Sequence, residues 1–203
     1  MKILSLFLGF SLFALASSSA QKRLSIAPLY WYEYTPYSYQ VSLNYNGLPT
    51  QSQGTGHTSV SSIGLTASYH FAPQWNLSLG VLYSRNTIHI QSPQGPFGEL
   101  PSFTSKGVRI PLLISYRLTD NRLSPYVSGG AVFTKNNTYT EDAIKTDGLI
   151  GVGLDYRFNS ALSLLLQPTA SYSFSPPINS SVYHLTNYRS YALGIQTQLI
   201  WHF

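Results

Sequence analysis

The chain has 203 residues, and only 9% of them are charged, whereas about 25% is typical of soluble domains. A soluble fold would therefore lack the residues for a charged surface. The chain contains no cysteine, which excludes disulfide bonds and thiolate metal sites. Its formal net charge of +5 is small and the basic residues are scattered, so we expect no nucleic-acid partner.

The first twenty residues have the organisation of a secretory signal. Met1 and Lys2 give a short positive start, residues 3–15 are mostly apolar, and Ser18 and Ala20 have the spacing that a signal peptidase reads. The apolar run is short for a membrane-spanning helix, although a retained anchor is the alternative. We expect a cleaved signal peptide at 1–20 and a single domain at 21–203, which contains no apolar stretch long enough for a spanning helix.

Eight segments of the expected domain alternate between apolar and polar residues with the period of a β-strand. They are residues 24–34, 60–71, 75–85, 106–118, 123–134, 148–158, 162–174 and 191–203. Each is longer than the 5–6 residues of an ordinary strand and suits the ~9–11 residues that a tilted transmembrane strand needs. An even count of eight is the smallest standard outer-membrane barrel.

The two faces of these segments differ in charge. The face assigned to the outside carries aliphatic and aromatic residues and no Asp, Glu, Lys, Arg or His at the assigned positions. The opposite face is assigned the polar side chains, namely Glu33, His70, Arg85, Arg109, Arg117, Asp155, Arg157, Gln167, Gln196, Gln198 and His202. Because Arg or Lys facing lipid at mid-depth costs about 2–4 kcal/mol, the pattern predicts an all-β, eight-stranded antiparallel transmembrane up-and-down β-barrel. A soluble lipocalin-type barrel, with the reverse polarity, is the alternative.

The gaps between the segments alternate in length. Residues 72–74, 119–122 and 159–161 form short gaps, and residues 35–59, 86–105, 135–147 and 175–190 form long ones. Short periplasmic turns and long external loops are typical of such barrels, so both ends of the barrel sequence are expected at the periplasmic side. The four long gaps are the expected contact regions for an envelope protein partner.

The inward charges favour a structural role. Glu33, Arg109, Arg117, Asp155 and Arg157 are expected to form a polar pairing network that fills a narrow lumen. A small-solute or ion path through this lumen is the functional alternative. No metal ligand set, cofactor site or catalytic group is expected.

The histidines give little support for catalysis. His57, His89 and His184 lie in or near the long gaps, whereas His70 and His202 lie at the opposite end of the barrel. A lipid A-modifying enzyme would need a histidine with a serine nucleophile and an acid at the outer leaflet. Since no carboxylate recurs with these histidines on one strand, we expect a protein that is not an enzyme.

Three segments resemble a known family. Residues 123–133 contain the pattern Pro-Tyr-x-x-x-Gly, residues 149–160 are similar to that family's sixth strand and turn, and the chain closes on Trp201-His202-Phe203. The chain resembles the small eight-stranded outer-membrane β-barrels of the OmpA-barrel, OmpX-like and OmpW-like group. It is most similar to the outer membrane protein beta-barrel domain family common in Bacteroidota.

The resemblance implies the outer membrane of a Gram-negative bacterium, contact with outer-membrane lipid and insertion by the barrel-assembly machinery. The last strand, with Tyr191, Leu199, Trp201 and Phe203, would be the assembly signal. The expected function is non-enzymatic and structural or surface-binding, in membrane integrity, adhesion or an envelope complex. The alternative is a narrow barrel for small solutes, and a lipid A-modifying enzyme is a remote one.

Overall fold

The protein is a closed β-barrel. The computed structural model describes residues 23–45, 48–91, 102–136, 144–174, 183–186 and 191–203. The strands are β1 (Leu24–Tyr45), β2 (Leu48–Ala72), β3 (Trp75–Gln91), β4 (Phe103–Arg117), β5 (Leu123–Asn136), β6 (Lys145–Arg157), β7 (Leu162–Ser173), β8 (Tyr183–Thr186) and β9 (Tyr191–His202). None of the described residues forms a helix long and apolar enough to cross a membrane.

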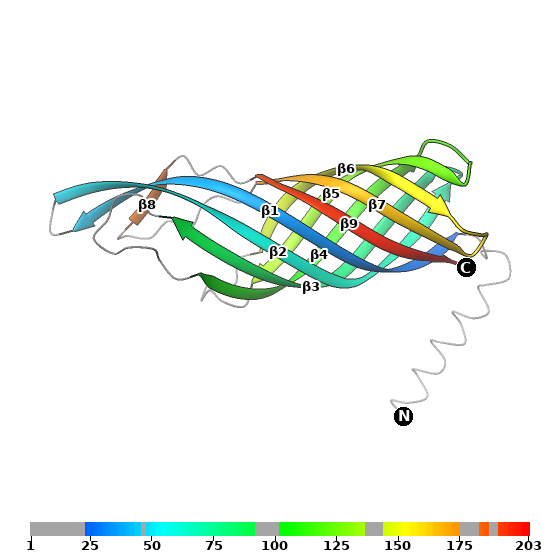
Figure 1. Ribbon diagram of the computed structural model, residues 1–203, viewed down its shortest axis with the longest axis horizontal. Helices are drawn as coiled ribbons and strands as arrows, with labels where there is room; N and C mark the ends of the chain where they lie inside the picture. Colours follow the sequence, from blue (N-terminus) through cyan, green and yellow to red (C-terminus); the bar gives the residue numbers. More distant parts are fainter. Residues whose placement is uncertain (1–22, 46–47, 92–101, 137–143, 175–182, 187–190) are drawn as a thin grey trace, which may run out of the picture.

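Closure results from the pairing of the first and last barrel strands. β1 pairs antiparallel with β2 on one side and with β9 on the other, so eight strands form a continuous ring (Figure 1). The ninth strand, β8, pairs with β1 from Gln40↔Thr186 to Leu43↔Tyr183 and lies outside this ring. The prediction of an eight-stranded closed antiparallel barrel is confirmed.

The barrel has two different ends. At the first, here called the turn end, short connections join β2 to β3, β4 to β5 and β6 to β7, and Ser25 pairs with His202. At the second, here called the loop end, the long connections leave the barrel. Side chains accept backbone hydrogen bonds in the short turns: Asn159 Oδ1 accepts from the N–H groups of Ala161 and Leu162 at 2.8 and 2.9 Å.

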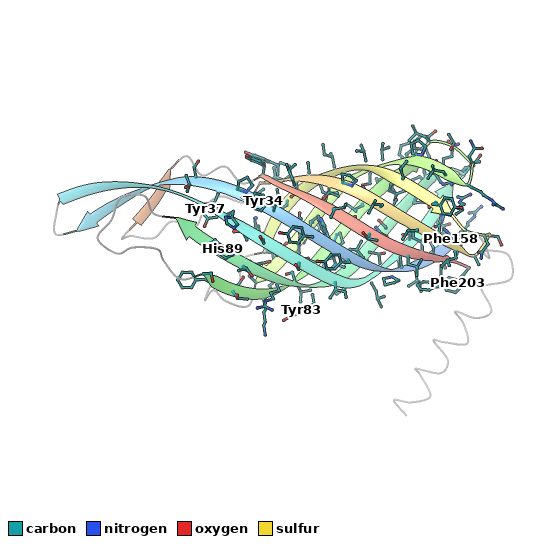
Figure 2. The ribbon with its side chains drawn as sticks, in the orientation of Figure 1. Tyr34, Tyr37, Tyr83, His89, Phe158 and Phe203 are labelled. Carbon is teal, nitrogen blue, oxygen red and sulfur yellow. The ribbon has the colours of Figure 1, made fainter. Side chains whose placement is uncertain are left out.

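The outer wall is apolar and exposed. Ile63, Leu65 and Ile150 are 62%, 60% and 68% exposed, which a protein surrounded by water on all sides would not show over a whole belt. Aromatic rings gather near both ends of this belt, and Figure 2 shows Phe158 and Phe203 at the turn end and Tyr34 and Tyr83 nearer the loop end. This arrangement matches the interfacial aromatic girdles of membrane barrels.

One facing assignment was wrong. Arg85 was assigned to the lumen, but it has the same parity as Tyr83 and its side chain is exposed on the outer wall. It is the direct register partner of Lys106, which is also exposed. Both residues lie toward the loop end, where an outward charge can leave the hydrocarbon layer.

The prediction of a loop at 35–59 was also wrong. β1 continues to Tyr45 and β2 begins at Leu48, with ladder pairing up to Tyr45↔Leu48. These strands have 22 and 25 residues, and their hairpin projects far beyond the rest of the barrel (Figure 1). Residues 37–45 alternate between apolar and polar side chains, but on the opposite parity to residues 24–34, so the continuation of the strand was not recognised. The partner segment, residues 48–59, is polar and has no such alternation.

The other long gaps are shorter than expected. β3 extends to Gln91 and β4 begins at Phe103, while β5 ends at Asn136 and β6 begins at Lys145. The gap at 175–190 contains β8. The remaining residues of these predicted loops, and the expected signal peptide at 1–20, lie outside the described residues.

Candidate functional site

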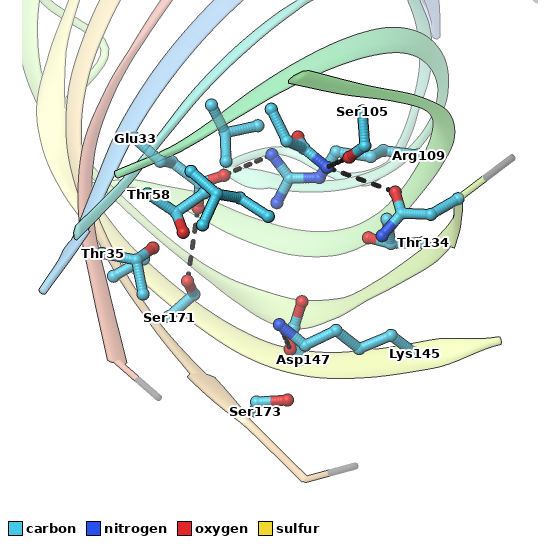
Figure 3. A pocket seen from close by; sticks show the side chains of 15 residues that line it. Glu33, Thr35, Thr58, Ser105, Arg109, Thr134, Lys145, Asp147, Ser171 and Ser173 are labelled. Atoms are coloured by element: carbon cyan, nitrogen blue, oxygen red, sulfur yellow. Dashed lines mark hydrogen bonds and ion pairs between the residues drawn. The ribbon is translucent and has the colours of Figure 1, made fainter. Parts of the chain in front are cut away.

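A buried ion pair crosses the lumen toward the loop end. Arg109 on β4 donates through Nη1 to Glu33 Oε2 on β1, and the two side chains are 5% and 4% exposed (Figure 3). Ser171 Oγ donates to the other carboxylate oxygen at 3.3 Å. Because β2 and β3 separate β1 from β4 in the wall, this pair joins distant parts of the ring.

The Arg109 guanidinium also rests on an aromatic ring. Its carbon lies 4.0 Å from the centroid of Trp31, which is a cation–π geometry. Trp31 is fully buried, and its indole N–H donates to Thr169 Oγ1 at 3.2 Å. The charge layer and the tryptophan together form one fixed unit across the barrel.

Apolar side chains fill the lumen around Trp31. The cluster consists of Leu29, Trp31, Leu82, Leu113, Val132 and Leu149, none more than 7% exposed. We call it the lumen plug. A small eight-stranded barrel has an interior just wide enough for side chains, and here they are mostly apolar at this level. Trp31 was missed from the sequence, although it has the same inward parity as Glu33.

A second ion pair lies nearer the turn end. Arg117 Nε donates to Asp155 Oδ2 at 2.8 Å, with side chains 4% and 8% exposed. Its Nη1 and Nη2 groups donate to the carbonyl oxygens of Thr119 and Asn121 at 2.7 and 2.5 Å. One arginine therefore links the wall, the lumen and the β4–β5 turn.

The five residues expected to form one network are thus divided. Glu33 and Arg109 form one pair, Arg117 and Asp155 form another, and no ion pair among the described residues joins the two. Arg157 is half-buried near Arg117 and Asp155 but makes no ion pair with the described part of the chain. The structure therefore places the predicted residues in two layers separated along the barrel.

Gly194 makes space for the Glu33–Arg109 ion pair. A Cβ atom at Gly194 on β9 would lie 2.7 Å from Glu33 Cγ and 2.9 Å from Thr169 Oγ1. Both neighbours belong to the layer that holds Arg109 and Trp31. Glycine at this inward position therefore lets the Glu33 side chain lie against the wall.

A polar cavity of about 200 Å³ opens above this layer at the loop end (Figure 3). We call it the vestibule. Its floor includes Glu33 and Arg109, and its wall carries Lys145, whose ammonium lies 3.4 Å from Asp147 Oδ1. Lys145 and Asp147 were not predicted as lumen residues.

Several polar atoms of the vestibule have no hydrogen-bond partner among the described residues. They are Asn86 Oδ1, Thr134 Oγ1 and Ser173 Oγ, all buried within the protein. Buried polar atoms are rarely left unsatisfied, so these atoms are expected to meet water or a polar solute. The cavity is large enough for several water molecules or one small polar molecule.

The described histidines do not assemble a nucleophilic site. His202 Nε2 lies 2.9 Å from Ser163 Oγ, but this serine is fully buried and the ring neighbour of His202 is His70. His57 and His89 stack with centroids 4.7 Å apart on the outer wall. The described residues contain no group of three or more potential metal-ligating side chains.

Comparisons with known proteins agree with this architecture. The comparison with curated protein sequences found no significant match. Among solved structures, the outer membrane protein OprG from Pseudomonas aeruginosa is similar, with a TM-score of 0.55, 16% identity and coverage of 91% of this chain and 98% of that chain. The outer membrane protein AlkL, studied in lipid bilayers, has a TM-score of 0.56 at 14% identity, covering 92% of this chain and 93% of its own.

At these identities the two structures establish the fold alone. The sequence establishes the family. Residues 6–195 match the model of the family described as "Outer membrane protein beta-barrel domain". The prediction of an outer-membrane location in a Gram-negative bacterium is confirmed by this match and by the barrel itself. The chain belongs to the outer membrane protein beta-barrel domain family.

Proposed function

We propose that this protein is a non-conducting outer-membrane barrel with a structural or surface-binding role. The observation that carries the proposal is the packed lumen, where the plug and the Glu33–Arg109 layer occupy the cross-section. Trp31, the largest plug residue, is fully buried. A barrel built to pass solutes would need a continuous polar path instead.

The loop end supplies the surfaces for binding. In this class short turns face the periplasm, so the vestibule and the β1–β2 hairpin would face the outside of the cell. Function on a rigid scaffold usually lies in such connecting segments. An envelope partner would meet the protein in the regions 35–59, 86–105, 135–147 and 175–190, and membrane integrity, adhesion and complex formation are the roles that suit this arrangement.

Assembly would use the last strand. β9 closes the ring against β1, and Tyr191, Trp201 and Phe203 are exposed on its lipid-facing side, with Leu199 on the same face. We propose that the barrel-assembly machinery reads these residues. Deletion of Phe203 should lower the amount of folded barrel in membranes, measured as the band whose mobility changes on heating, while total synthesis stays constant.

Conductance measurements test the non-conducting proposal. Purified protein in a planar lipid bilayer should give no single-channel steps. Trp31→Ala removes the largest plug side chain and should admit a measurable current, whereas Tyr30→Ala, which changes an outward side chain 48% exposed, should not. Reproducible steps from the unmodified protein would support the alternative of a narrow small-solute barrel, which the unsatisfied vestibule atoms favour.

We also propose that the barrel has no catalytic activity. The support is that the Ser163–His202 pair is buried at the turn end and that the described part of the chain provides no carboxylate to orient either His57 or His89. Incubation of the folded protein with lipid A and mass analysis of the lipid should show no change. Release or transfer of an acyl chain would contradict the proposal.

A further inference from the structure

Three basic side chains gather on the outer wall at the loop end. Arg85 on β3, Lys106 on β4 and Lys135 on β5 are all exposed, and we call them the outer basic cluster. Arg85 and Lys106 are direct register partners. Because Val108 pairs with Lys135, Lys135 is the diagonal neighbour of Lys106 on the same face.

The cluster borders the apolar belt. Each of its members lies two residues beyond a lipid-facing side chain of its own strand, respectively Tyr83, Val108 and Phe133, which are 50%, 44% and 37% exposed. Figure 2 shows Tyr83 on the outer wall. Two residues of a strand span about 6.6 Å, which places the charges where the hydrocarbon layer gives way to lipid headgroups.

Arg85 and Lys106 have no balancing charge among the described residues. Like charges directly opposite each other on neighbouring strands are destabilising. Arg85 and Lys106 form no ion pair with any described residue, and the described carboxylates lie elsewhere. Glu33, Asp147 and Asp155 are buried in the lumen, and Asp120 lies in the β4–β5 connection at the turn end.

We propose that the outer basic cluster binds the phosphate groups of an anionic lipid in the leaflet at the loop end. Arginine matches phosphate with two parallel hydrogen bonds, and lysine adds a mobile point charge. Tyr83, Val108 and Phe133 lie directly below and provide an apolar surface for the acyl chains of the same lipid. The proposal extends beyond the proposed function, since it requires only that the barrel sits in the outer membrane.

Lipid retention by the full-length folded protein tests this site. The protein, purified in a neutral detergent, is titrated with bisphosphorylated lipid A, and bound lipid is counted by native mass spectrometry. Near a charged membrane surface each basic residue contributes about fivefold in affinity. The double variant Arg85→Gln/Lys106→Gln should therefore bind about 25-fold more weakly than the unmodified protein.

A matched variant controls for net charge. Arg23→Gln/Arg122→Gln removes two exposed cations near the turn end and should leave lipid binding unchanged. Dephosphorylated lipid A should bind no better than a neutral lipid, and inorganic phosphate at the same concentration should not compete, because it lacks the acyl chains. Heat-dependent mobility verifies that both variants fold.

Two results would overturn the proposal. Equal binding of lipid A by the two double variants would show that the cluster does not hold the lipid, including the case in which carboxylates of this same chain neutralise it. Equal retention of phosphorylated and dephosphorylated lipid A would show that the apolar wall alone binds the lipid.

Discussion

Replacement of Glu33 by Gln tests how the lumen is held together. The change keeps the shape of the side chain and removes the charge that faces Arg109, a residue that is 4% exposed. Removing one partner of a buried ion pair costs about 3–5 kcal/mol, because the other charge stays buried and unpaired. Arg109 would keep its contact with Ser62 at 3.4 Å and its position 4.0 Å from the Trp31 centroid.

Those remaining contacts set the expected magnitude. A cation–π contact is worth about 0.5–2 kcal/mol, so the loss should lie near the lower end of the range, at about 3 kcal/mol. Equilibrium unfolding by urea in lipid vesicles, followed by tryptophan fluorescence, measures the free energy of unfolding. The fully buried Trp31 provides a probe in the affected layer.

The partly exposed ion pair at the vestibule provides the comparison. The side chains of Lys145 and Asp147 are 42% and 10% exposed and both line the vestibule, where water can replace the lost ammonium, so Lys145→Gln should cost about 1 kcal/mol, less than Glu33→Gln. Adding Arg109→Met to Glu33→Gln removes the orphaned charge and should recover part of the lost stability. A Glu33→Gln effect as mild as that of Lys145→Gln would contradict a stabilising buried ion pair. A double variant less stable than Glu33→Gln alone would contradict the cost assigned to the unpaired Arg109 charge.

Two further substitutions test the lipid face and the packing of the lumen. Leu112→Arg places a charge at an outward position that is 40% exposed, so it should destabilise the folded barrel by about 2–4 kcal/mol. The amount of folded barrel in membrane fractions should fall for Leu112→Arg and stay unchanged for Leu112→Met. A normal yield of the Arg variant would contradict the assigned facing. Gly194→Ala should cost about 1–3 kcal/mol in urea unfolding, because its Cβ would meet Glu33 and Thr169. Gly129→Ala, whose nearest neighbour would be 3.6 Å away, should be nearly neutral, and equal effects at both glycines would contradict the packing.

The transmembrane part of the fold was predictable because the lipid requires an apolar side chain at every outward position of a strand. A strand in the membrane must alternate, and segments such as 106–118 and 162–174 match β4 and β7 within a few residues. The hairpin beyond residue 35 was missed because the alternation of residues 37–45 has the opposite parity to that of residues 24–34, and because residues 48–59 are polar and resemble a loop.

The organisation of the lumen was only partly predictable. Alternation correctly placed Glu33 and Arg109 inside, but it could not show which charge meets which, since β1 and β4 are not neighbours in the wall. Trp31 lies between the outward Tyr30 and Tyr32, so alternation already placed it inside, but the sequence did not show that it would fill the lumen. Arg85 was misplaced although its parity with Tyr83 already indicated the outer wall.

We expect the lumen to be closed between the vestibule and the turn end. The absence of cysteine from the chain allows single cysteines to report access from outside the cell. Thr35→Cys lines the vestibule, whereas Ser84→Cys lies at a fully buried inward position. A membrane-impermeant thiol reagent added to intact cells should label Thr35→Cys readily and Ser84→Cys only after unfolding. Rapid labelling of Ser84→Cys in the folded protein would contradict a closed lumen.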